Sequence, residues 1–121
     1  MPSNIRVVKT AIFISGRGSN MKSLIKYSQK KNSKIEIAKV FSNNKTAQGI
    51  DTAKQLNVPE IFYYSNKSFE EKIKNNLDDI ELICLAGFMK ILSPSFVKKW
   101  KERLINIHPS YLPYFKGLNA Q

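Results

Sequence analysis

Three short segments carry residues whose types and spacing could do chemistry. The first is Ser15-Gly16-Arg17-Gly18-Ser19-Asn20, between an expected strand and an expected helix. Glycines let the backbone approach a ligand, and a helix N-terminus presents free N–H groups to an anion. The segment fits a phosphate-binding loop to which Ser19 and Asn20 add side-chain hydrogen bonds, and it fits a tight turn equally well. It is not a dinucleotide fingerprint, because Met21 takes the third glycine's place, and it lacks the Gly-Lys-Ser/Thr ending of a P-loop.

The second segment is Asn106-Ile107-His108, at the end of an expected strand. Side chains alternate along a strand, so Asn106 and His108 share one face and Ile107 is expected to be buried on the other. Imidazole can transfer a proton near neutral pH, and an amide can stabilise a developing oxyanion. The alternative is a half-buried histidine bonded to the backbone, which residue type alone favours.

The third segment runs from Leu85 to Pro94, after the fourth expected strand. Gly87 allows a sharp turn, and Phe88, Met89, Ile91 and Leu92 could form an apolar ledge on which a flat heterocycle lies. Composition alone favours ordinary core packing. A single histidine and a single cysteine supply no transition-metal cluster, so no metal site is expected, and Cys84 is interpreted as a small buried hydrophobic residue.

Short β-branched runs alternate with helix-period segments along the chain. The expected strands cover residues 7–15, 35–41, 60–63, 80–86 and 104–108. Ser19 is the expected N-cap of the first helix. The second and third helices are indicated by apolar residues at helical spacing, namely Ile50, Ala53 and Leu56, then Phe69, Ile73 and Leu77. Ser93-Pro94 predicts the start of a fourth helix that buries Phe96, Val97 and Trp100.

This alternation predicts an α/β fold of the Rossmann-like type, a parallel sheet with helices on both faces. Ligands of such sheets bind beyond the carboxyl ends of the strands. All three segments follow strands, so we expect them to meet at that edge.

Length and composition limit the alternatives. The chain has 121 residues, enough for one domain, and its 42% hydrophobic content is globular. The net charge of +11 favours anionic partners, but the lysines are scattered and no nucleic-acid reading motif is visible, so no nucleic-acid partner is expected. One cysteine and the lack of a signal-peptide pattern or long apolar run predict a cytoplasmic protein without a membrane partner.

Four motifs, in order, give the chain a specific resemblance. They are Ile14 to Asn20, Phe41-Ser42-Asn43, Leu85 to Pro94, and Asn106 to Pro113 with Phe115-Lys116-Gly117. Together they resemble the phosphoribosylglycinamide formyltransferase family, the folate-dependent enzymes of purine synthesis. The last motif also resembles methionyl-tRNA formyltransferase and formyltetrahydrofolate deformylase, whereas the loop from Gly16 to Asn20 favours the ribonucleotide enzymes.

The resemblance implies a reaction and a role for each segment. The formyl group of 10-formyltetrahydrofolate would pass to the amine of glycinamide ribonucleotide. Asn106 and His108 would be catalytic. Gly18, Ser19 and Asn20 would hold the substrate phosphate, and Arg17 is included with them. The folate pocket would be lined by Met89, Lys90, Ile91 and Leu92.

The sequence departs from the family pattern at two places. Asn66 takes the position of a folate-contacting arginine, with Lys67 beside it as a possible substitute. The family also continues beyond Gly117 to a catalytic aspartate, and no aspartate follows Asp79 here. We therefore expect residues 1–121 to be the N-terminal nucleotide-binding part of a formyltransferase domain that binds ligand with little activity. The alternatives are a deformylase-like hydrolase, a non-catalytic nucleotide-binding fragment and, on charge alone, an RNA-associated protein.

Overall fold

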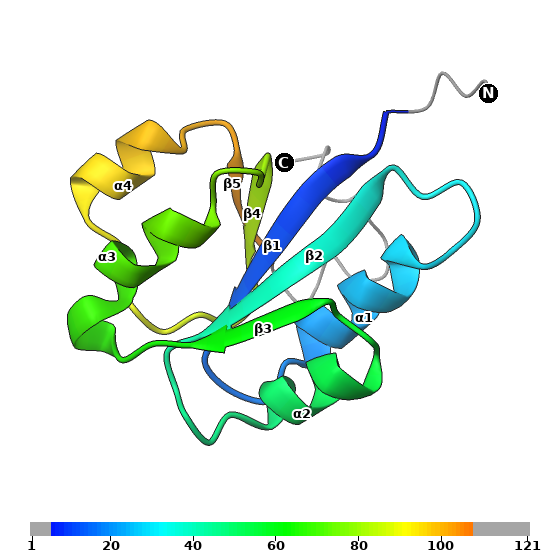
Figure 1. Cartoon of the computed structure of the whole chain (residues 1–121), viewed down its shortest axis with the longest axis horizontal. Helices are drawn as coiled ribbons and strands as arrows, with labels where there is room; N and C mark the ends of the chain where they lie inside the picture. The colour runs from blue at the N-terminus through cyan, green and yellow to red at the C-terminus, as the bar shows by residue number, and fades with distance from the viewer. Residues whose placement is uncertain (1–5, 108–121) are drawn as a thin grey trace.

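The protein forms a parallel sheet with two helical layers. The structure is a computed structural model that describes residues 6–107. Five strands lie in the order β3-β2-β1-β4-β5, each parallel to its neighbours (Figure 1). Their bounds are β1 Val8–Ile14, β2 Ile35–Ser42, β3 Glu60–Tyr63, β4 Leu82–Leu85 and β5 Leu104–Asn106. This arrangement confirms the predicted α/β fold.

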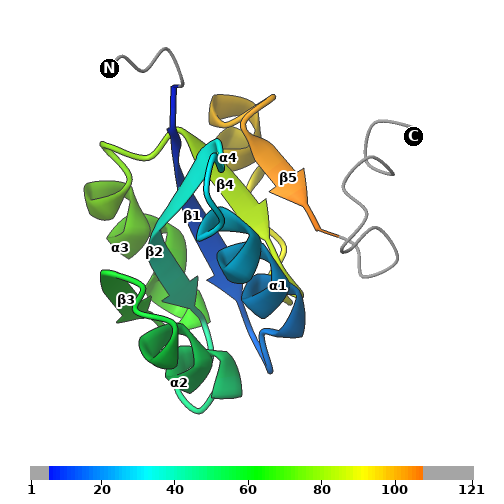
Figure 2. The ribbon, with the colours of Figure 1, turned by 90° about the vertical axis from the view of Figure 1, so that its right-hand side faces the viewer.

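Helices cover both faces of the sheet. One face carries α1 (Ser19–Ser28) and α2 (Gln48–Gln55), which stand in front of the strands in Figure 2. The other carries α3 (Phe69–Ile73), between the 3-10 turns η1 (Asn66–Ser68) and η2 (Lys74–Asn76), and α4 (Pro94–Lys99). Parallel strands need crossover connections, and these helices supply them.

The central strand β1 divides the core in two. Ile12 and Ile14 face α1 and α2, whereas Ala11 and Phe13 face α3 and α4, and all four are fully buried. Such a strand, apolar on both sides, is typical of a parallel sheet covered on both faces. It therefore gives the loop that follows it a rigid base.

Three details of the predicted helices are wrong. Gly18, not Ser19, is the N-cap of α1, because its left-handed backbone (φ 77°) turns the chain into the helix. The third helix is one short α segment between 3-10 turns, although Phe69, Ile73 and Leu77 are buried as expected. Val97 is 43% exposed, so α4 buries only Phe96 and Trp100, as suits a short helix with a narrow contact face.

A β-bulge lies in β2 opposite the step from Thr10 to Ala11. Thr10 pairs with Ile37 and Ala11 pairs with Lys39, which leaves Ala38 as the extra residue. Lys39 is 7% exposed, and its ammonium donates to the Asn76 carbonyl oxygen at 2.7 Å. The bulge thus directs a lysine of a central strand beneath η2, an outcome that the sequence pattern did not predict.

None of the helices within residues 6–107 is both long enough and apolar enough to cross a membrane.

Candidate functional site at the carboxyl edge of the sheet

The loop after β1 turns sharply at Gly18 and lies against α2. A Cβ atom on Gly18 would stand 2.9 Å from the Met21 Cε and 3.0 Å from the Gly49 Cα. The Gly49 N–H donates to the Gly16 carbonyl oxygen at 3.0 Å. The close approach of the two segments therefore requires glycine on both sides.

The residues predicted to bind phosphate surround the start of α1. Arg17 and Ser19 are exposed, and Gly18 and Asn20 are partly exposed. No side chain caps this helix end, and its first turn holds no acidic residue. The free N–H groups and the positive end of the helix dipole are thus open to an anion.

Four loops at this edge are joined by side-chain hydrogen bonds. The Ser15 hydroxyl donates to the Asn43 Oδ1 at 2.6 Å and accepts from the Met89 backbone N–H at 2.8 Å. The Asn43 amide donates to the Asn66 Oδ1 at 2.7 Å. The loops that follow β1, β2, β3 and β4 are therefore linked, and Asn66 lies at this edge of the sheet.

The predicted apolar ledge is divided between surface and core. The Met89 and Ile91 side chains are 82% and 93% exposed. The Phe88 ring packs 5.3 Å from the Phe13 ring, and Leu92 is only 8% exposed. The Leu92 side chain is therefore part of the core, and Met89 and Ile91, with the partly exposed Lys90 between them, form the open surface.

The segment 89–92 is anchored at its far end by α3. Both Glu70 carboxylate oxygens accept from Ser93, one from its backbone N–H and one from its hydroxyl, each at 2.6 Å. The Ser93 hydroxyl accepts from the Phe96 N–H, which confirms Ser93 as the N-cap of α4.

Asn106 ends β5 and is exposed at the same edge of the sheet. Ile107 is 5% exposed and packs with the α1 side of the core, so the predicted alternation is correct for this pair. The Ile107 N–H donates to the Leu85 carbonyl oxygen, which ties the end of β5 to β4. His108 lies outside the described residues.

The ionisable groups with shifted pKa values lie away from this edge. Burial raises the pKa of the Cys84 thiol to about 12, so this side chain is an unreactive part of the core, as expected. Hydrogen bonds from Lys9 and Lys39 hold the pKa of Asp79 below its usual value. Within residues 6–107, no cluster of His, Cys, Asp and Glu could hold a metal ion.

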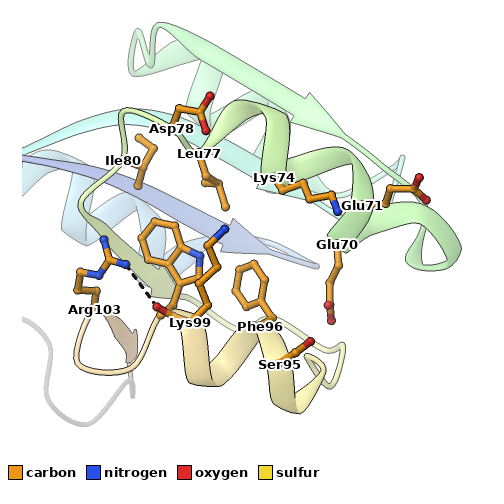
Figure 3. Close-up of a pocket in the computed structure, with 11 residues that line it drawn as sticks. Glu70, Glu71, Lys74, Leu77, Asp78, Ile80, Ser95, Phe96, Lys99 and Arg103 are labelled. Atoms are coloured by element: carbon orange, nitrogen blue, oxygen red, sulfur yellow. Dashed lines mark hydrogen bonds between the residues drawn. The ribbon is translucent and has the colours of Figure 1, made fainter.

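A cleft of about 650 Å³ lies elsewhere, between α3–η2 and α4 (Figure 3). Trp100 and Ile80 line it, and acidic and basic side chains alternate around it. The Arg103 guanidinium lies 4.3 Å from the centre of the Trp100 ring. Among residues 6–107, none of the predicted site residues lines this cleft.

Sequence reasoning gave no connecting role to two residues, Asn43, which was noted only as part of a motif, and Glu70. Asn43 directly follows a buried strand, and that position was a usable signal, since polar residues there reach the carboxyl edge. Glu70 gave no such signal, because its partner Ser93 is 23 residues away and reaches it only through the fold.

Comparison with known proteins places the chain in a family. The Formyl transferase family profile matches residues 8–121. A trifunctional purine biosynthetic protein adenosine-3 of Gallus gallus is 44% identical over 120 residues, which cover 93% of this chain and 12% of that protein. A phosphoribosylglycinamide formyltransferase of Haemophilus influenzae is 37% identical over 93% of this chain and 56% of its own length.

A solved structure gives the same result in three dimensions. The phosphoribosylglycinamide formyltransferase from Anaplasma phagocytophilum superimposes with a TM-score of 0.79 at 43% identity, over 95% of this chain and 56% of that one. The present chain thus spans about half the length of the single-function relatives. Its sheet, its edge loops and the family match agree, and the chain belongs to the formyl transferase family.

Proposed function

We propose that the whole protein transfers a formyl group from 10-formyltetrahydrofolate to the amine of glycinamide ribonucleotide, a step of purine (IMP) biosynthesis. One observation carries this proposal. The glycine loop, the exposed segment 89–91 and Asn106 lie at one edge of the sheet, and the Ser15 hydroxyl bonds the loop to that segment. The names of the relatives supply the substrate and pathway.

The substrate phosphate would bind at the start of α1. Gly18, Ser19 and Asn20 offer backbone N–H groups and side chains there, and Arg17 adds an exposed positive charge. The uncapped helix end supports this role.

The formyl donor would lie against residues 89–92. Met89 and Ile91 are exposed apolar side chains in a segment outside helix and strand, and its backbone groups would recognise a flat pterin. Asn66 would border the same pocket. No metal is required by these contacts.

The reaction would take place between the two substrates, beside Asn106. The substrate amine attacks the formyl carbon, and the Asn106 amide donates to the oxyanion that develops there. His108, two residues further, would accept the proton of the amine and pass it to the departing nitrogen of the folate. Transfer is complete when the bond between the formyl carbon and the folate nitrogen breaks.

We further propose that residues 1–121 are the N-terminal, nucleotide-binding part of this domain. The family resemblance implies an aspartate that orients the histidine, and no aspartate stands after Asp79 within residues 1–121. Loss of an orienting carboxylate lowers rates by orders of magnitude in catalytic triads. The 121 residues alone should bind glycinamide ribonucleotide with little or no turnover, in the cytoplasm and without nucleic-acid or membrane partners.

The first prediction tests this function in the full-length protein. Amine-dependent formyl transfer from 10-formyltetrahydrofolate is expected, and His108→Ala should lower kcat at least 100-fold with small changes in both KM values. Formate release without an amine acceptor would instead identify a deformylase-like hydrolase. Unchanged transfer by His108→Ala would refute the proposed mechanism.

Binding of glycinamide ribonucleotide to the 121-residue chain distinguishes a nucleotide-binding fragment from an RNA-associated protein. Calorimetry should find saturable binding of glycinamide ribonucleotide, and Asn20→Ala should weaken it, whereas Asn32→Ala, in the turn between α1 and β2, should not. Tight and steeply salt-dependent RNA binding in place of nucleotide binding would favour an RNA-associated protein.

A further inference from the structure

Ser15 lies at the junction between the expected phosphate loop and the expected folate surface. It follows the last residue of β1 and is 9% exposed. Its hydroxyl donates to Asn43 and accepts from the Met89 backbone N–H. Because Asn43 uses its own amide on Asn66, its Oδ1 is left to orient the Ser15 hydroxyl toward Met89.

The two segments that Ser15 joins are not equally dependent on it. The phosphate loop has other anchors, because Asn44 donates to the Ser15 carbonyl oxygen and Gly49 to the Gly16 carbonyl oxygen, each at 3.0 Å. These bonds use backbone carbonyls and do not need the Ser15 side chain.

The segment after β4 relies on side chains at both ends. Residues 89–93 form neither helix nor strand. Its near end is bonded to Ser15 through the Met89 N–H, and its far end to Glu70 through Ser93. The exposed Met89 and Ile91 side chains lie between these two anchors.

We propose that Ser15 is a positioning residue that holds the segment 89–92 at a set distance from the phosphate loop. This inference rests on the proposed function, in which the two segments bind the two substrates. A reaction between bound molecules is sensitive to displacements of about 1 Å, so a fixed hydrogen bond between their binding segments favours productive alignment. Ser15 itself need not touch either substrate.

Only the segment 89–92 depends on the Ser15 side chain, and this difference can be tested in the full-length enzyme. Ser15→Ala removes the acceptor of the Met89 N–H and leaves the carbonyl anchors of the phosphate loop intact. The KM for 10-formyltetrahydrofolate should rise about tenfold, while the KM for glycinamide ribonucleotide should change less than twofold. A purely structural role would reduce the amount of active enzyme, and hence apparent kcat, with both KM values unchanged.

Ser28→Ala is the matched control. It also removes a partly buried serine hydroxyl, one that donates to the Ile25 carbonyl oxygen at the end of α1, away from the site. This variant should leave both KM values as in the unmodified enzyme. Asn43→Ala serves as a second variant if Ser15→Ala does not fold, and it should raise the donor KM about threefold, because it frees the orientation of the Ser15 hydroxyl.

Two results would overturn the inference: an unchanged donor KM in the folded variant, or an equal rise of both KM values. Failure of the proposed function has a different signature, namely no amine-dependent transfer by the unmodified enzyme. In that case the dissociation constant of the folate, measured by calorimetry on the same variants, still decides whether Ser15 positions its surface.

Discussion

At the residue scale, the shape of the loop that joins β1 to α1 depends on the backbone of Gly18. Its φ of 77° lies in the left-handed region, where a side chain is strained. The space is closed as well, because a Cβ atom there would stand 3.0 Å from the backbone of Gly49. Gly16 in the same loop has neither restriction, since nothing lies within 4 Å of its Cβ position.

This difference predicts unequal effects of alanine in one loop. Gly18→Ala should lower the free energy of unfolding by about 2 kcal/mol, from backbone strain and crowding. Gly16→Ala should change it by less than about 0.5 kcal/mol. Urea titration of both variants measures the difference, and equal stabilities would contradict the assigned conformation of Gly18.

At the scale of elements, Glu70 joins two helices that are distant in sequence. It belongs to α3, and its carboxylate binds both the backbone N–H and the hydroxyl of Ser93, the N-cap of α4. One side chain thus sets the start of α4 and the end of the segment 89–92. The adjacent Glu71 is exposed and has the same charge.

Glu70→Ala should therefore destabilise the protein by about 1–2 kcal/mol, because two donors of Ser93 lose their partner. Glu71→Ala should have an effect below about 0.5 kcal/mol, although it removes the same charge. Thermal unfolding of the two variants, side by side, measures this difference. Equal losses for the two variants would show that charge, rather than the Ser93 contact, determines the effect.

At the scale of the whole molecule, the two edges of the sheet have different roles. The carboxyl edge carries the loops of the candidate site. At the opposite edge, the Asp79 carboxylate accepts hydrogen bonds from the ammonium groups of Lys9 at 3.1 Å and Lys39 at 3.2 Å. The Glu81 carboxylate there forms an ion pair with Arg6 and accepts a hydrogen bond from the Lys9 backbone N–H. Hydrogen bonds to Lys9 and Lys39 lower the pKa of Asp79, and the bond from the Lys9 backbone lowers the pKa of Glu81.

A lowered carboxyl pKa in the folded state has a defined effect on stability. The contribution of Asp79 is fully present above the usual aspartate pKa of about 3.9, and it is lost as the pH falls through the lower folded value. Asp79→Asn should reduce the urea midpoint at pH 7, and the difference from the unmodified protein should shrink as the pH falls below about 4. Asp78→Asn is the control, because Asp78 is an exposed neighbour. A difference that persists unchanged at pH 2.5 would refute the ionic origin.

Much of the fold could be predicted from local sequence patterns. The β-branched runs of β1 and β2, the strand Glu60–Tyr63 and the Ser93-Pro94 helix start all lie where the pattern indicated. The errors in helix boundaries came at α1 and α3. There the helix ends were set by a left-handed glycine and by 3-10 turns, which depend on neighbouring segments more than on apolar spacing.

In the candidate site, too, some features could be predicted from the sequence and others could not. The position of residues after strands was enough to place the glycine loop, residues 89–92 and Asn106 at one edge, because parallel strands carry their loops there. Their expected roles came from the family resemblance. The links between those loops were decided by the tertiary structure. Ser15 meets Met89 across 74 positions and Glu70 meets Ser93 across 23, and no local pattern encodes such pairs. The burial of Lys39 and Leu92 likewise follows from a bulge and from packing, which arise only when the elements come together.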